Sequence, residues 1–93
     1  MPSNTPLNKR AVALIYEQNK QRAPKVAAKG EGFLAEKIIQ KAKEYEIPIF
    51  QSKALVDSLI NVELDAEIPP TLYQAVVEVF IWLYQTEKKA QMS

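Results

Sequence analysis

The sequence predicts an α/β domain in which a small mixed sheet of three to four strands is surrounded by three helices. Two short apolar segments, residues 10–17 and 25–29, are typical of strands. Three later segments carry apolar residues at helical spacing or begin with helix-capping signals. A chain of 93 residues is long enough for one such domain and too short for two.

The first predicted strand, residues 10–17, is apolar almost throughout, which indicates burial on both faces. Residues 18–22 are polar and predict the turn that follows. Pro24 fixes its own φ and favours an extended conformation of Ala23. The second predicted strand, residues 25–29, is short, and its alanines allow a helix to pack closely against it.

Gly30 and Gly32 are the only glycines in the chain, and both fall where the second strand gives way to a helix. Backbone freedom is useful at such a junction. The helix is predicted for residues 32–45, because its apolar residues repeat at helical spacing: Leu34, Ala35, Ile38, Ile39 and Ala42. Pro48 ends this pattern, and residues 47–50 predict a brief strand, where a proline suits a strand start or a sheet edge.

A short helix is predicted for residues 53–60, with Ser52 as its cap, and an acidic loop over residues 61–67 follows it. Two consecutive prolines then favour the first turn of a last helix. We predict that this helix runs to about Glu87 and that the polar residues after it fray.

The apolar face of the last helix is unusually wide. One stripe consists of Leu72, Val76, Val79 and Leu83, and a second stripe beside it consists of Tyr73, Val77, Phe80 and Tyr84. A surface helix needs a single stripe about 100° wide. The second stripe therefore indicates either deep burial or a docking surface, and the sequence leaves both interpretations open.

We predict three parts in the chain: a flexible N-terminal segment (residues 1–8), a single domain (residues 9–87) and a flexible tail (residues 88–93). No apolar run approaches the roughly 20 residues that span a bilayer. The N-terminal segment lacks the apolar core of a signal peptide. The absence of cysteine from so small a chain favours the cytoplasm.

Charge is unevenly distributed, although the net charge is only +1. Residues 1–30 carry six basic and one acidic side chain, whereas residues 31–93 carry six basic and ten acidic side chains. So small a net charge argues against a nucleic-acid partner or a membrane surface. The uneven distribution indicates either ordinary solvated surface or a basic face for an acidic protein, formed by Lys9, Arg10, Lys20, Arg22 and Lys25.

No group of residues in the sequence suggests an enzyme. Without histidine or cysteine, the usual nitrogen and sulfur metal sites and thiol- or histidine-based catalysis are excluded. Glu63, Asp65 and Glu67 lack the spacing and the glycine of a calcium-binding loop. Residues 30–32 (Gly-Glu-Gly) are too short for a phosphate-binding loop. We therefore expect no catalytic residue, no metal and no cofactor.

Four segments carry a more specific signal. They are residues 11–14 (Ala-Val-Ala-Leu), 23–30 (Ala-Pro-Lys-Val-Ala-Ala-Lys-Gly), 47–49 (Ile-Pro-Ile) and 67–76, which includes Glu-Ile-Pro and Leu-Tyr-Gln-Ala-Val. In order and spacing they closely resemble the cytoplasmic C-terminal domain of the FlhB/YscU family, the switch proteins of flagellar and virulence type III export machines. The resemblance covers about residues 8–86 and implies a small sheet surrounded by helices.

Two departures from the family pattern bear on function. Family members carry a membrane half before this domain, and we expect the present chain to be the domain alone. Members also carry Asn-Pro-Thr-His before the first strand, where the asparagine attacks its own backbone carbonyl and the chain breaks before the proline. The matching positions here are Pro6, Leu7, Asn8 and Lys9, so we predict no self-cleavage. The chain also begins close to where the family's cleaved fragment begins.

The resemblance implies a binding site as well. In the flagellar members, a small hydrophobic patch is thought to receive a short motif of rod and hook subunits that await export. Aligned residue by residue, this patch falls on Ala23, Pro24, Val77 and Phe80. The alternative is that Val77 and Phe80 simply pack under the Ala-Pro loop.

The resemblance thus implies a non-enzymatic component of flagellar type III export that stands in for the cleaved C-terminal fragment in substrate-specificity switching. Its expected partners are rod- and hook-type substrates, the membrane-anchored homologue, the export gate and the hook-length control protein. Its expected location is cytoplasmic and peripheral at the export apparatus, with no membrane insertion. The alternative is a soluble adaptor or regulator that binds another protein through the basic face or an open sheet edge.

Overall fold

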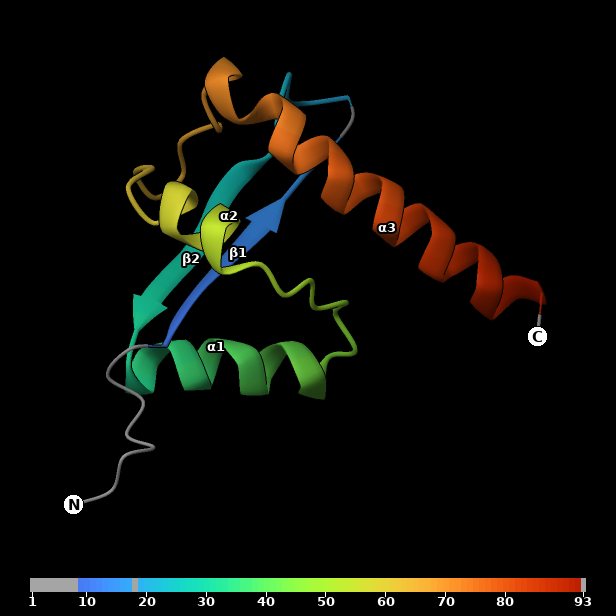
Figure 1. Ribbon diagram of the computed structural model, residues 1–93, viewed down its shortest axis with the longest axis horizontal. Helices are drawn as coiled ribbons and strands as arrows, with labels where there is room; N and C mark the ends of the chain where they lie inside the picture. Colours follow the sequence, from blue (N-terminus) through green and yellow to red (C-terminus); the bar gives the residue numbers. More distant parts are fainter. Residues whose placement is uncertain (1–8, 18, 93) are drawn as a thin grey trace.

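The computed structural model describes residues 9–17 and 19–92 (Figure 1). Within these residues its elements are β1 (Arg10–Ile15), β2 (Lys25–Glu31), α1 (Phe33–Glu44), α2 (Lys53–Leu59), the 3-10 turn η2 (Pro70–Leu72) and α3 (Tyr73–Met92). In Figure 1 the strands lie in the middle, α1 crosses one end of them, and α3 starts at the other end and runs away from them. The predicted α/β fold with three helices is confirmed.

The predicted mixed sheet of three to four strands is not confirmed. Among the described residues the sheet has two strands, and they are antiparallel. β1 pairs with β2 from Arg10 opposite Glu31 to Ile15 opposite Lys25, with an irregularity after Ala13. The two strands therefore form a hairpin with a long connection, and the helices pack around it.

Residues 65–68 lie along the start of β2 without forming a full third strand. Val26 exchanges two backbone hydrogen bonds with this segment, of 3.1 and 2.8 Å, and the Ile68 N–H donates to the Pro24 carbonyl at 2.9 Å. Asp65 has a φ of 69°, which turns the chain at one end of the segment. The proline that follows the segment has no N–H to continue the pairing. The backbone pairing with β2 therefore ends at Asp65 on one side and at Pro69 on the other.

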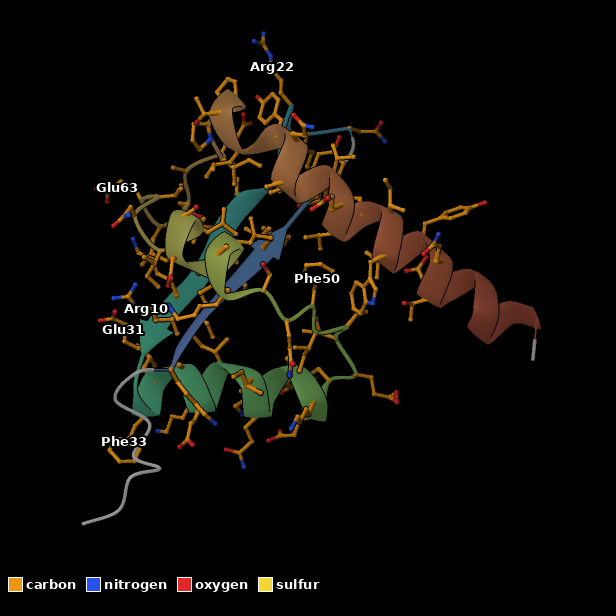
Figure 2. All side chains as sticks on the ribbon, in the orientation of Figure 1. Arg10, Arg22, Glu31, Phe33, Phe50 and Glu63 are labelled. Atoms are coloured by element: carbon orange, nitrogen blue, oxygen red, sulfur yellow. The ribbon has the colours of Figure 1, made fainter. Side chains whose placement is uncertain are left out.

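The predicted strand over residues 47–50 is wrong, because the C-terminal cap of α1 uses the Ile47 N–H, which a strand would need for its own pairing. Glu46 has a φ of 57°, and the Ile47 N–H donates to the Ala42 carbonyl at 2.8 Å. This is a Schellman cap, and it leaves Ile47 and Pro48 with no N–H for a sheet. The segment instead sends the Phe50 ring toward α3 (Figure 2).

The other boundaries differ from the predictions by a few residues. β1 ends at Ile15, two residues early, and α3 continues to Met92, beyond the predicted end near Glu87. Residues 1–8 lie outside the described part of the chain. The division into a domain of residues 9–87 and two flexible ends stays a prediction.

The core lies between the hairpin, α2 and the first turns of α3. Its buried cluster consists of Ala23, Leu59, Ile68 and Val76, with Val12, Leu14, Leu55, Val62 and Leu72 packed against it. The Lys29 ammonium of β2 donates to the carbonyls of Ile60 (3.0 Å) and Val62 (2.7 Å). These carbonyls follow α2, so one side chain fixes the end of α2 to the sheet.

Both glycines have structural roles at the junction of β2 and α1. Gly32 precedes α1 with φ 62° and ψ −128°, a conformation that only glycine adopts readily. A Cβ on Gly30 would overlap the Leu34 side chain, so its absence lets α1 lie close to the strand. The predicted need for backbone freedom is confirmed at Gly32.

We predict that Glu46→Gly raises the free energy of unfolding by about 1 kcal/mol, because the left-handed conformation costs glycine nothing sterically. Chemical denaturation monitored by circular dichroism measures the change. Glu36→Gly is the matched control: Glu36 lies inside α1, so the same substitution there should lower stability by about 1 kcal/mol. Equal losses in the two variants would contradict the prediction.

Asp57 gives a prediction for acid stability. Its carboxylate accepts hydrogen bonds from Lys53 Nζ and Arg10 Nη1, both at 3.1 Å. The hydrogen bond from Lys53, with the smaller effect of Arg10, lowers the pKa of Asp57. The folded state therefore holds this carboxylate charged more strongly than the unfolded chain does, and the resulting stability is present above about pH 4.

As the pH falls from about 4 through the lowered pKa of Asp57, this contribution should be lost. Thermal melts over this range should show that Asp57→Asn is less sensitive to acid than the wild type. Parallel curves for wild type and Asp57→Asn would show that this ion pair contributes nothing to stability.

Candidate functional site

A pocket of about 200 Å³ opens between the loop that precedes β2 and the first turns of α3. It is lined by Tyr16, Arg22, Ala23, Pro24, Ile68, Tyr73, Val76, Val77 and Phe80. All four residues of the predicted patch are among them. The structure thus brings together two pairs of residues that are about fifty positions apart in the sequence.

Hydrogen bonds fix the loop side of the pocket. The Gln21 side-chain amide donates to the carbonyls of Ile15 (3.2 Å) and Ala23 (3.0 Å), which holds the loop against the end of β1. The Pro24 carbonyl accepts the N–H of Ile68 at 2.9 Å. Ala23 and Pro24 are both buried, so they form a rigid inner wall.

The α3 side of the pocket is more accessible. Val76 points into the core, whereas Val77 is 50% exposed and Phe80 is 37% exposed at the rim. The Phe80 ring lies on the Tyr16 ring, with 5.7 Å between the centroids and an angle of 51° between the planes. Neither Val77 nor Phe80 is buried under the loop, so the wide apolar face of α3 is partly open to solvent.

Arg22 is the charged residue of the pocket lining. Figure 2 shows its side chain beside the start of α3, pointing away from the domain. Among the described side chains it makes no ion pair. The pocket therefore combines apolar walls with one positive charge at its edge. Such a lining can hold an apolar side chain.

The predicted basic face is not a single surface. Arg10 and Arg22 lie at opposite ends of the hairpin (Figure 2). Lys9 lies 3.4 Å from Glu36, Arg10 contacts Glu31 and Asp57, and Lys20 lies 3.4 Å from Glu17. Lys25 stands opposite Glu67 in the isolated bridge. Three of the five cations thus form ion pairs with acidic side chains, and the backbone of a fourth, Lys25, is paired with that of Glu67.

The predicted patch did not include five of the residues that line the pocket: Tyr16, Arg22, Ile68, Tyr73 and Val76. Tyr16 follows the last residue of β1, and its role depends on a loop conformation that no periodic pattern encodes. Of the positions matched to the cleavage motif, Pro6, Leu7 and Asn8 lie outside the described residues. Lys9 is exposed. No helix in the described part of the chain is both long and apolar enough to cross a membrane.

Comparison with known proteins identifies the family. A family model described as the FlhB HrpN YscU SpaS family matches residues 8–83. The chain is 37% identical to the Bacillus subtilis protein YlqH, over 98% of this chain and 97% of that protein. It is 43% identical to the flagellar biosynthetic protein FlhB of Yersinia enterocolitica over 84% of this chain, and it spans 21% of that protein.

The fold agrees with a solved structure. The crystal structure of the cytoplasmic domain of FlhB from Shewanella putrefaciens matches with a TM-score of 0.83 and 32% sequence identity, over 88% of this chain and 68% of that one. The resemblance that the four sequence segments carry is thereby confirmed. The chain belongs to the FlhB HrpN YscU SpaS family.

Proposed function

We propose that this domain is a binding component of flagellar type III protein export and that its pocket receives a short apolar segment of a rod- or hook-type export subunit. The observation that carries the proposal is the grouping of Ala23, Pro24, Val77 and Phe80 in one pocket with an exposed rim. Similarity to FlhB supplies the export context.

The dimensions of the pocket support an apolar side chain as its occupant. A cavity of about 150 Å³ lined by aliphatic and aromatic groups holds a benzene ring. The pocket here has about 200 Å³ and a comparable lining, open at the rim. One large aliphatic or aromatic side chain would bury its surface against Pro24 and Phe80, and Arg22 at the edge would favour a nearby acidic group on the bound segment.

We further propose that the domain acts without chemistry of its own. Residues 6–9 read Pro-Leu-Asn-Lys and supply neither the asparagine–proline bond nor the histidine of the family's cleavage motif. In this proposal the domain works beside the membrane-anchored homologue, on the cytoplasmic side of the export gate. There it takes the place of the cleaved C-terminal fragment in substrate-specificity switching, together with the hook-length control protein.

The adaptor alternative, with a basic face as its binding surface, has less support. Arg10 and Arg22 lie at opposite ends of the hairpin (Figure 2), and three of the five cations form ion pairs with acidic side chains. A partner bound by charge would have to displace these neighbours. The pocket requires no such rearrangement.

Val77→Asp should weaken binding of a rod- or hook-type subunit at least tenfold, because a carboxylate at the rim would have to be desolvated by the apolar segment. Isothermal titration calorimetry measures the affinity. Since Val77 is half exposed, the thermal melt should stay near that of the wild type. Ile47→Asp is the matched control, because Ile47 is also β-branched and 56% exposed but does not line the pocket. Equal affinity of wild type and Val77→Asp would reject the pocket as the binding site.

A cellular test addresses the switch role. In a strain whose FlhB homologue retains only its membrane half, this protein should raise export of hook-type subunits, and Val77→Asp should not. Immunoblots of the culture medium measure export. If wild-type protein gives no more export than an empty vector, the stand-in role is wrong, whatever the domain binds in solution.

A further inference from the structure

Arg22 stands at the edge of the pocket, on a loop that is held on both sides of it. Before Arg22, the Gln21 amide donates to the carbonyls of Ile15 (3.2 Å) and Ala23 (3.0 Å). After it, Ala23 and Pro24 are buried in the inner wall. The backbone of Arg22 therefore has a fixed position, whereas its side chain is exposed and extends outward beside the start of α3 (Figure 2).

The Arg22 guanidinium is the charge that the pocket lining carries, because the other lining residues are uncharged. Lys20, two positions earlier on the same loop, is paired with Glu17 at 3.4 Å. Arg22 has no such acidic partner among the described side chains, and Glu78, the acidic residue in the first turns of α3, does not line the pocket. A carboxylate brought to this edge by a bound segment would thus displace no internal ion pair.

Affinity and selectivity have different sources in such a pocket. An apolar side chain that enters it gains affinity by leaving water. An exposed ion pair at the edge adds little affinity, but it favours one sign of charge on the partner and disfavours the other. A guanidinium suits this role, because two parallel N–H groups can donate to the two oxygens of one carboxylate.

We propose that Arg22 determines the specificity of the pocket and that the bound segment carries an acidic residue within two positions of its large apolar side chain. In an extended segment successive residues are about 3.3 Å apart, so this spacing keeps the carboxylate close to the pocket edge. A segment with lysine or arginine at the same place is disfavoured. This inference rests on the proposed function, since it requires the apolar side chain to occupy the pocket.

Three short synthetic peptides test the inference. Each has one phenylalanine among glycines and serines, and they differ only in the residue beside it, which is aspartate, asparagine or lysine. Nuclear magnetic resonance titration of the full chain measures weak affinities, and the Val77 and Phe80 amide signals report occupancy of the pocket. The aspartate peptide should bind about two- to fivefold more tightly than the asparagine peptide, and the lysine peptide more weakly than both.

Salt and substitutions separate the effect of Arg22 from that of the apolar contact. Salt at about 1 M should remove the preference for aspartate, because it screens exposed charges beyond about 3 Å. Arg22→Gln should bind the three peptides with equal affinity, and Arg22→Glu should reverse their order. Lys20→Gln is the matched control, since it removes an exposed cation of the same loop that does not line the pocket, and it should keep the wild-type preference.

The outcomes distinguish failure of this inference from failure of the proposed function. Equal binding of the three peptides by the wild type, abolished by Val77→Asp, would reject the role of Arg22 and leave the pocket as a binding site. Loss of the preference in Lys20→Gln as complete as in Arg22→Gln would also reject it, because the effect would then be one of total charge. If no peptide shifts the Val77 and Phe80 signals, both the inference and the proposed pocket are wrong.

Discussion

The pairing of residues 24–26 with residues 65–68 holds the rest of the structure in place. Val26 is fully buried, and both its N–H and its carbonyl bond to the second segment. Lys29, on the same strand, binds the two carbonyls that follow α2. Because buried backbone groups are costly when unpaired, this set of bonds fixes where the chain leaves α2 and where α3 begins.

This constraint gives the pocket two walls of different character. The Ala23–Pro24 wall belongs to the paired segment and cannot move without breaking backbone hydrogen bonds. The α3 wall is held in place by Val76, which is buried in the core. Farther along the helix, the Trp82 ring contacts the Phe50 ring edge to face, with 5.3 Å between the ring centroids. At the rim Phe80 contacts the Tyr16 ring, and both Val77 and Phe80 remain partly exposed. A fixed wall facing a partly exposed apolar rim suits recognition of a short segment.

Periodicity and capping signals were sufficient to predict the two hairpin strands and the three helices, because each has a local cause in the sequence. They failed for residues 47–50, because the cap at the left-handed Glu46 uses the Ile47 N–H. They also failed for the number of strands, because the turn at Asp65 and the proline after Ile68 limit the extended stretch between them. The wide face of α3 was visible in the sequence. That Ala23 and Val77 share a pocket came only from the family resemblance, and the contribution of Tyr16 depends on a loop that has no periodic pattern.

The separation of the pocket walls along the chain has a consequence for the order of folding. Pro24 and Val77 are joined through a loop of about fifty residues, and closing such a loop costs entropy that only the finished contacts repay. The hairpin and α1 are local and can form first, as the N-terminal part of the chain is synthesised first. The pocket exists only after the last helix has docked. A copy of the domain that has this pocket has therefore docked its last helix. If the pocket binds as proposed, nascent or partly unfolded copies do not take part in that binding.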